Sequence, residues 1–174
     1  MKLLRHGDFG QEKPGIIDQD GKIRDLSKHI SDINGNTISS DGLKKISAID
    51  LSSLPIVPDN TRLGACVGSV GKFLCIGLNY SDHAAESGLP VPSEPILFSK
   101  ATSAIVGPND NVEIPRNSSE TDWEVELGII IGKKAKYIDE NSAQDYIAGY
   151  CVINDVSERA FQIKREGQWT KGKS

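Results

Sequence analysis

The stretch DWEVELGIIIG, residues 122–132, has the composition of a β-strand and decides how the fold is interpreted. Valine and isoleucine are concentrated in it, and glycines bound its apolar run. Side chains alternate between the two faces of a strand, so Glu124 and Glu126 are expected to share one face. The opposite face is expected to point into a core and consists of Trp123, Val125, Leu127, Ile129 and Ile131.

A third carboxylate follows a second strand-like run, YCVIN at residues 150–154, which ends next to Asp155. Two carboxylates on one strand face repel each other unless solvent or a cation compensates them. The oxygens of Glu124, Glu126 and Asp155 suit a hard divalent cation such as Mg²⁺. The alternative is that the Glu-x-Glu pattern marks the solvated face of a half-buried sheet, because all-oxygen motifs also arise by chance.

Composition narrows the class of protein. A length of 174 residues suits one ordinary domain, or a small domain and part of a larger one. Hydrophobic residues make up 37% and charged residues 25%, as in soluble globular proteins. The net charge of −4 and the scattered lysines and arginines argue against a nucleic-acid partner and against an anionic membrane surface.

The termini and cysteines favour a cytoplasmic protein. The first residues lack the apolar segment of a signal peptide, and no stretch approaches the roughly 20 apolar residues of a transmembrane helix. The three cysteines, Cys66, Cys75 and Cys151, form no CxxC motif and are odd in number. Buried free thiols in a reducing compartment are therefore expected.

Turn and strand signals divide the chain into a small β-rich leading domain at 1–58 and a second domain at 59–174. The expected fold class is α+β and β-rich. The leading domain is expected to contain strands at 1–5, 14–18 and 23–26, a hairpin turn at 18–22 and a short helix at 40–46. The second domain is expected to contain a buried strand at 72–78, strands at 95–99 and 150–154, and helices at 81–88, 141–147 and 157–165.

Two pairs of polar residues have the spacing of one helix face. His83 and Glu86 lie three residues apart, and a carboxylate beside an imidazole raises its basicity and orients it to activate water. Arg159 and Gln162 have the same spacing, and they could offer a guanidinium and an amide to a carboxylate ligand. The alternative for both pairs is a solvated helix face. The terminal KGKS, which contains Lys173, is by default a flexible basic tail.

Several ordered segments together resemble the fumarylacetoacetate hydrolase family, specifically its longer bacterial members with a small leading domain. The resemblance is continuous from about residue 72 and weaker before that. The matching segments are CIGLNY at 75–80 with His83 and Glu86, PILFSK at 95–100, AIVGP at 104–108, EVELG at 124–128, GYCVINDVS at 149–157 with Arg159 and Gln162, and KGKS at 171–174.

The resemblance implies a fold and a set of roles. The fold would be a mixed β-sandwich or roll, and family members continue for roughly another hundred residues, so the C-terminal part of the catalytic domain is expected to be missing. Glu124, Glu126 and Asp155 would bind Mg²⁺, or Mn²⁺ or Ca²⁺. His83, Glu86 and Lys173 would be catalytic, and the substrate would contact Tyr80, Arg159 and Gln162.

The implied activity is metal-dependent chemistry on small 2-oxo acids or β-dicarbonyl compounds through a metal-bound enolate. C–C bond hydrolysis of an acylpyruvate-type compound is the leading expectation. The alternatives within enzymes are an isomerase or decarboxylase of 2-hydroxyhepta-2,4-diene-1,7-dioate type, in the breakdown of aromatic compounds, and ureidoglycolate lyase. A β-domain that only binds metal or protein is the alternative outside enzymes. The family habit also implies a homodimer.

Overall fold

The computed structural model describes residues 1–174, and the chain divides into two compact units. The first unit consists of Met1–Val70, Val106–Val112 and Glu126–Ile153. The second unit consists of Gly71–Ile105, Glu113–Val125 and Asn154–Ser174. The expected boundary between 58 and 59 stays a prediction. The architecture is mixed α+β and rich in short strands, as predicted.

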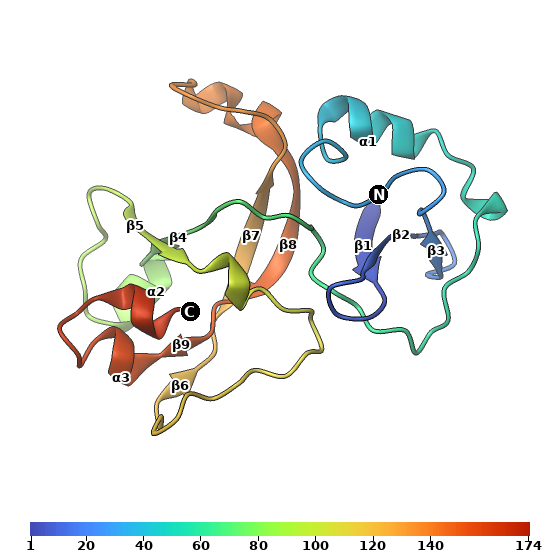
Figure 1. The fold of residues 1–174 in the computed structure, drawn as a ribbon. Coiled ribbons are helices and arrows are strands. Elements are labelled where there is room, and N and C mark those ends of the chain that lie inside the picture. The colour runs from blue at the N-terminus through green and yellow to red at the C-terminus, as the bar shows by residue number, and fades with distance from the viewer. The chain divides into compact units, whose positions relative to one another are not determined.

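A three-stranded antiparallel sheet begins the first unit, in the order β1 (Lys2–His6), β2 (Lys13–Ile17) and β3 (Ile23–Asp25) (Figure 1). The turn between β2 and β3 is closed by Asp18, whose Oδ1 accepts hydrogen bonds from the backbone N–H groups of Asp20 and Lys22 at 3.0 and 2.9 Å. The strands and the hairpin turn therefore form where the sequence predicts them.

Helix α1 (Ser40–Ser47) covers an apolar core in the first unit. The hydroxyl of Ser39 caps the helix by accepting from the N–H of Gly42 at 3.1 Å, which satisfies one of the free donors of the first turn. A 3₁₀ turn, η1 (Leu51–Ser53), follows. The buried core consists of Ile16, Leu26, Ile46 and Leu54, with Leu3, Ile30, Ile49 and Leu51 packed against it.

Strands β7 (Val125–Ile131) and β8 (Ile147–Asn154) pair with each other. Their connection contains η3 (Glu140–Tyr146), a 3₁₀ helix where an α-helix at 141–147 was predicted. The expected alternation is present, but the prediction of a buried apolar face is wrong. Leu127 and Val152 are 59% and 81% exposed, and Trp123, Val125, Ile129 and Ile131 are at least half exposed. The acidic positions are the more covered ones, since Glu124 and Glu126 are half-buried.

The second unit pairs β4 (Phe73–Gly77) with β5 (Ile96–Lys100), antiparallel, with α2 (Ser81–Glu86) between them in the chain and η2 (Thr102–Ala104) after them. The predicted strands and helix are present. The prediction that the first of these strands is buried is wrong, because the side chains of Leu74 and Ile76 are 56% and 41% exposed. The strand alternates between covered and exposed positions, as half-buried strands do.

The C-terminal segment of the second unit begins with a second small ladder, β6 (Thr121–Asp122) against β9 (Ser157–Glu158). Helix α3 (Arg159–Gln162) and the 3₁₀ turn η4 (Trp169–Gly172) follow. The helix predicted at 157–165 is thus shortened to one turn, because its first two residues pair as a strand. The terminal KGKS is not an exposed tail, since Lys173 is buried.

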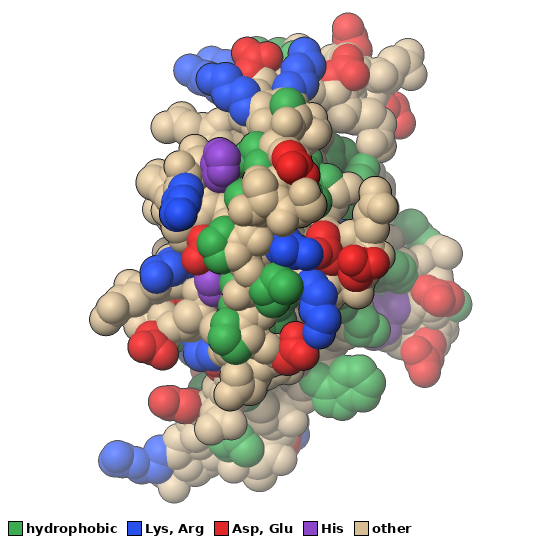
Figure 2. Space-filling model, turned by 90° about the vertical axis from the view of Figure 1, so that its right-hand side faces the viewer, with side chains coloured by type: hydrophobic (Ala, Val, Ile, Leu, Met, Phe, Trp, Pro, Cys, Tyr) green, Lys and Arg blue, Asp and Glu red, His purple; other side chains and the backbone are tan.

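The surface carries mixed charge. On the face shown in Figure 2, acidic and basic side chains alternate with apolar ones. No helix of the structure has the length and apolar character needed to cross a bilayer. The cysteines are free thiols, as predicted, but all three are half-buried where full burial was expected.

Candidate active site

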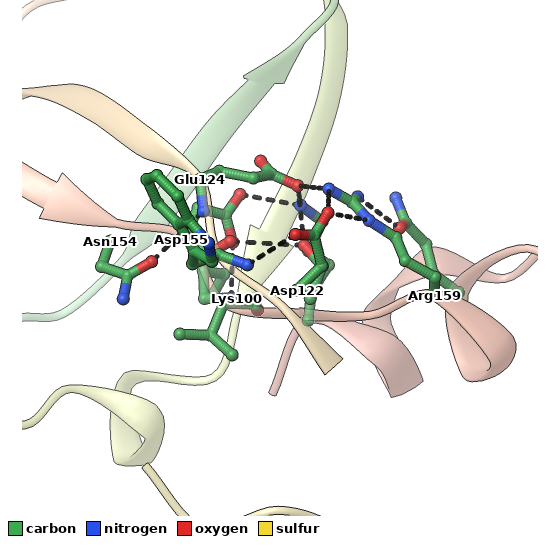
Figure 3. Close-up of polar contacts among 11 residues, drawn as sticks. Lys100, Asp122, Glu124, Asn154, Asp155 and Arg159 are labelled. Atoms are coloured by element: carbon green, nitrogen blue, oxygen red, sulfur yellow. Dashed lines mark hydrogen bonds and ion pairs between the residues drawn. The ribbon is translucent and has the colours of Figure 1, made fainter. Parts of the chain in front are cut away.

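A buried aspartate is the centre of the polar cluster in the second unit (Figure 3). Asp155 follows β8 and is only 3% exposed. Its Oδ1 lies 2.6 Å from Lys100 Nζ, and its Oδ2 lies 2.9 Å from Lys173 Nζ. Its backbone N–H donates to the carbonyl of Glu124 at 2.9 Å. One carboxylate is therefore held by two ammonium groups, each of which is itself buried.

Glu124 shares one of these partners. Its Oε1 lies 3.0 Å from Lys173 Nζ and 2.6 Å from a terminal nitrogen of Arg159, and it accepts from the Ser157 hydroxyl at 2.8 Å. The backbone N–H of Glu124 donates to the Asn154 side chain at 3.2 Å. The residues that precede β7 and follow β8 thus bring Glu124 and Asp155 to one cation.

Arg159 at the start of α3 connects two carboxylates. Its Nε and a terminal nitrogen donate to Asp122 Oδ2 at 3.0 and 2.7 Å, and its other terminal nitrogen donates to the amide oxygen of Gln162 at 3.0 Å. Burial lowers the pKa of Arg159, but the hydrogen bonds that Arg159 donates to Asp122 and the charge of Glu124 outweigh it and raise the pKa overall. The same guanidinium lowers the pKa of Asp122. Gln162 is buried, so the pair predicted to share a helix face does meet.

The position of Lys173 depends on close packing along the last turn. A Cβ on Gly172 would lie 2.5 Å from the backbone nitrogen of Gln162 and 2.7 Å from the carbonyl of Glu158, so only glycine permits this approach. Trp169 packs edge-on against Phe98, with ring centroids 5.4 Å apart. Lys173 Nζ lies 4.9 Å from the Phe98 ring centroid, within cation–π range.

Glu158, a carboxylate next to the site, stabilises the β6–β9 ladder and the start of α3. Glu158 caps α3 by accepting from the N–H of Ala160 at 3.3 Å. It also accepts from the hydroxyls of Ser118 and Thr121, and the Ser118 hydrogen bond is the main reason that its pKa is lowered. Glu158 therefore fixes the start of the helix that carries Arg159.

The remaining predicted site residues lie elsewhere. Tyr80, His83 and Glu86 are exposed on or beside α2 in the second unit. The side chains of His83 and Glu86 make no hydrogen bond or ion pair with each other in this structure. Glu126 lies on β7 in the first unit and is half-buried. The structure thus brings together Glu124, Asp155, Lys173, Arg159 and Gln162.

Two of the three predicted metal ligands converge. No group of three His, Cys, Asp or Glu side chains is close enough to hold a metal ion in this structure. Glu124 and Asp155 nevertheless meet at one cation, Lys173 Nζ, and their carboxylate oxygens are the donors that hard divalent ions prefer. The donor chemistry therefore fits such an ion, and the participation of Glu126 stays a prediction.

Sequence reasoning missed three members of the cluster. Lys100 ends β5 and binds both Asp155 and the carbonyl of Val156, the latter at 2.9 Å. Asp122 and Ser157 pair across the β6–β9 ladder and bind Arg159 and Glu124. The sequence feature that could have identified Lys100 is that a lysine ends an otherwise apolar strand. The sequence offered no comparable signal for Asp122 or Ser157, whose roles depend on the ladder.

Known proteins resemble the chain along most of its length. Residues 72–174 match the family described as fumarylacetoacetate (FAA) hydrolase C-terminal. A Burkholderia lata protein provisionally named a hydrolase is 62% identical over 173 residues, which are 99% of this chain and 61% of that protein.

Solved structures show the same fold. The fumarylacetoacetate hydrolase from psychrophilic Exiguobacterium antarcticum matches with a TM-score of 0.81 and 32% identity, over 100% of this chain and 62% of that one. The 2-hydroxyhepta-2,4-diene-1,7-dioate isomerase from Mycobacterium marinum matches with a TM-score of 0.70 and 29% identity, over 100% of this chain and 61% of that one. The predicted fold is confirmed, and the chain spans about three-fifths of the length of these proteins.

Proposed function

The chain belongs to the fumarylacetoacetate hydrolase family, and from that premise we propose that it forms part of a metal-dependent enzyme acting on small 2-oxo acids or β-dicarbonyl compounds. Hydrolysis of a C–C bond in an acylpyruvate-type compound is the reaction that we favour. The observation that carries the proposal is the buried cluster in which Glu124 and Asp155 share Lys173, next to Arg159.

Glu124, Glu126 and Asp155 would hold Mg²⁺, Mn²⁺ or Ca²⁺. When bound, such an ion acts as a Lewis acid that polarises the oxo group of the substrate. The charges of the described cluster balance, since three carboxylates (Asp122, Glu124, Asp155) face three cations (Lys100, Arg159, Lys173). A bound cation would therefore free positive side chains to bind an anionic substrate.

Lys173 and Arg159 are the groups that we assign to the substrate carboxylate and to the oxygen that becomes negative during bond cleavage. Fixed positive groups in a water-poor site stabilise developing charge more strongly than they do in water. Gln162 supports this role because it accepts from Arg159 at 3.0 Å and so limits the orientation of the guanidinium. Tyr80 would contact the part of the substrate that reaches solvent.

His83 would act as the general base that takes a proton from water, and Glu86 would orient its ring. Both side chains are exposed on the short helix α2. The helix would have to close over bound substrate for the pair to act, which places proton transfer after substrate binding. The same base would serve isomerisation if it took the proton from a substrate carbon in place of water.

An isomerase acting on a compound of 2-hydroxyhepta-2,4-diene-1,7-dioate type is the second candidate. The match to the M. marinum isomerase favours it, at 29% identity over the whole of this chain. The two candidates differ in whether water enters the reaction. We further propose that the protein works in the cytoplasm on small molecules, without nucleic acid or membrane as a partner.

The test is turnover of acylpyruvates and oxaloacetate by the full-length protein, with Mg²⁺ and with EDTA. Loss of substrate absorbance is measured for both, and proton release is measured for the acylpyruvates, whose hydrolysis yields a new carboxylic acid. A diene-dioate substrate is assayed in parallel to separate hydrolysis from isomerisation. We expect turnover with Mg²⁺ and its loss with EDTA. A protein that only binds metal or another protein would release no protons under either condition.

Ligand assignment needs a matched pair of variants. Glu126→Gln is expected to weaken Mg²⁺ binding, measured by calorimetry, and to lower turnover. Glu140→Gln removes an exposed carboxylate on η3 and is expected to change neither. Unchanged Mg²⁺ affinity and turnover in Glu126→Gln would refute the metal assignment.

A further inference from the structure

A hollow of about 380 Å³ lies in the first unit, where the strands β1, β2 and β3 stand side by side (Figure 1). All of its lining residues belong to the first 61 positions, so it shares no residue with the cluster around Asp155. Its volume is in the range of natural small-molecule sites, which are mostly apolar and contain a few polar groups that orient the ligand.

The strand register places three polar side chains on one face of this sheet. His6 of β1 lies opposite Lys13 of β2, and Gly15 of β2 lies opposite Asp25 of β3. Residues that lie opposite each other share a face, and so do residues two positions apart on one strand. His6, Lys13 and Asp25 therefore share a face, and all three line the hollow.

The His6 ring lies in space that a glycine leaves open. A Cβ on Gly15 would lie 3.0 Å from His6 Cδ2, so a side chain at position 15 would press on the ring. The histidine is 5% exposed, and its Nε2 has no hydrogen-bond partner. A buried polar atom without a partner is costly. If the ring turned toward a ligand, it would give up no hydrogen bond of Nε2.

An apolar wall completes the hollow. A short segment runs beside β3, because the N–H of Asp25 donates to the carbonyl of Pro55 and the N–H of Val57 donates to that of Ile23, both at 2.9 Å. Val57 is buried and Ile56 is 57% exposed, and both line the hollow. The wall therefore offers apolar surface to the hydrocarbon part of a ligand.

The polar groups of the hollow carry defined charges. Burial is the main reason that the pKa of His6 is lowered, so the ring is uncharged near neutral pH. Burial raises the pKa of Asp25, but hydrogen bonds from Ser27, including one from its N–H at 2.6 Å, outweigh it and keep the carboxylate ionised. Lys13 is exposed, and neither Lys13 nor Asp25 is neutralised by an ion pair.

We propose that this hollow binds a small α-amino acid with an apolar side chain, at a site separate from the reaction proposed above. The ligand ammonium would donate to Asp25 and His6, and the ligand carboxylate would accept from Lys13. The ligand side chain would pack against Ile56 and Val57. An acceptor pair, one cation and an apolar wall are the complement of such a zwitterion.

Calorimetric titration of the chain with L-leucine tests the proposal, with three ligands that each lack one part of leucine. The ligand 4-methylpentanoate lacks the ammonium, 3-methylbutylamine lacks the carboxylate, and glycine lacks the side chain. We expect leucine to bind and each of the three to bind at least about tenfold more weakly, because each loses a charge-assisted hydrogen bond or apolar contact.

Variants locate the bound ligand. Lys13→Gln should weaken leucine binding at least about tenfold and leave 3-methylbutylamine binding unchanged, because only leucine has the carboxylate that Lys13 would bind. Asp25→Asn should weaken the binding of both ligands. Lys2→Gln removes an exposed lysine at the other end of β1 and should change neither. Circular dichroism confirms that each variant is folded.

Three results would overturn the proposal. The first is the absence of leucine binding by the wild-type chain up to about 10 mM, which is weaker than specific small-molecule sites usually bind. The second is equal binding of leucine and 4-methylpentanoate. The third is leucine binding that survives Lys13→Gln in full, which would place the ligand at another part of the chain.

Discussion

Lys100 Nζ lies 2.6 Å from Asp155 Oδ1, and both side chains are almost completely removed from solvent, with 7% and 5% of their surfaces exposed. The ammonium also donates to the carbonyl of Val156 at 2.9 Å. A buried charge without a partner is costly, so each member of this pair depends on the other.

Replacing Lys100 by methionine should therefore destabilise the protein strongly. The variant keeps the aliphatic volume but leaves Asp155 with Lys173 as its remaining cation. We expect a loss of about 3 kcal/mol in the free energy of unfolding, because breaking one side of a buried ion pair exposes its desolvation cost. Urea unfolding followed by circular dichroism measures it.

An exposed ion pair provides the control. Lys22 Nζ lies 3.0 Å from Asp59, with 47% and 78% of their side chains exposed. Lys22→Met should cost less than about 1 kcal/mol, because solvent screens this pair. Equal effects from Lys22→Met and Lys100→Met would contradict the importance of burial.

Gly172→Ala should displace Lys173, the neighbouring residue that we propose to be catalytic. The new methyl would lie 2.5 Å from a backbone nitrogen, which cannot move aside as a flexible side chain can. We expect a loss of about 1–3 kcal/mol in stability, as in overpacked sites, together with weaker turnover of the substrates proposed above. Thermal unfolding and the activity assay measure the two effects.

Gly71→Ala is the matched variant, since a Cβ at position 71 meets no atom within 4 Å. It should leave turnover unchanged. If Gly172→Ala kept full stability and full turnover, the close approach of η4 to α3 would not be a requirement for placing Lys173.

Lowering the pH should destabilise the first unit through His6. Its ring is buried and its Nε2 has no hydrogen-bond partner. Burial lowers the pKa of His6 in the folded state, although the charge of Asp25 opposes this and that of Lys13 assists it. The unfolded chain therefore takes up the proton first, so stability is lost as the pH falls below the ordinary value of about 6.5.

The measurement compares unfolding at about pH 6.5 and pH 5 for wild type and His6→Gln, in a range above the ordinary carboxylate pKa values. We expect the variant to lose less stability than wild type over this range. His29 is exposed, so His29→Gln should behave as wild type. If wild type and His6→Gln lost the same stability, neutral His6 would not contribute to the pH dependence.

The apolar faces of β7 and β8 should promote association with a second copy of the chain. Leu127, Ile129, Tyr150 and Val152 are at least half exposed there, and contiguous apolar surface of this kind commonly marks an interface. The homodimer expected from the family resemblance stays a prediction that this face makes testable. Light scattering after size-exclusion chromatography should show a mass above that of one chain.

Val152→Lys places a charge on this face and should shift the mass toward one chain. Val91→Lys changes a residue of similar exposure, 67%, outside both strands and should have no such effect. A wild-type protein that runs as a single chain at high concentration would argue against self-association through these strands.

Local patterns predicted most of the elements correctly. The turn residues at 18–22 and the serine cap at position 39 act through nearby backbone groups, so a short window of sequence contains the necessary information. The same holds for the meeting of Arg159 and Gln162, one helical turn apart. Strand patterns had already paired Glu124 with Asp155 and the family resemblance added Lys173, and the structure brings these three residues together.

The incorrect predictions concern which face of a strand is covered by the rest of the protein. Alternation in β7 identifies two faces, but period-two patterns cannot say which one is buried, because that depends on what lies against the strand. Leu127 was expected to be inside and is 59% exposed. Lys100 was missed because its role depends on Asp155, a residue 55 positions away.

The chain crosses between its two units five times, after residues 70, 105, 112, 125 and 153. Neither unit can therefore be excised as one continuous piece. During synthesis, both would remain incomplete until the ribosome has released the stretch beyond residue 125. A chaperone that shields nascent polypeptides would consequently meet unfinished forms of both units at once, and gene fusions that split the chain anywhere between residues 71 and 153 would divide both.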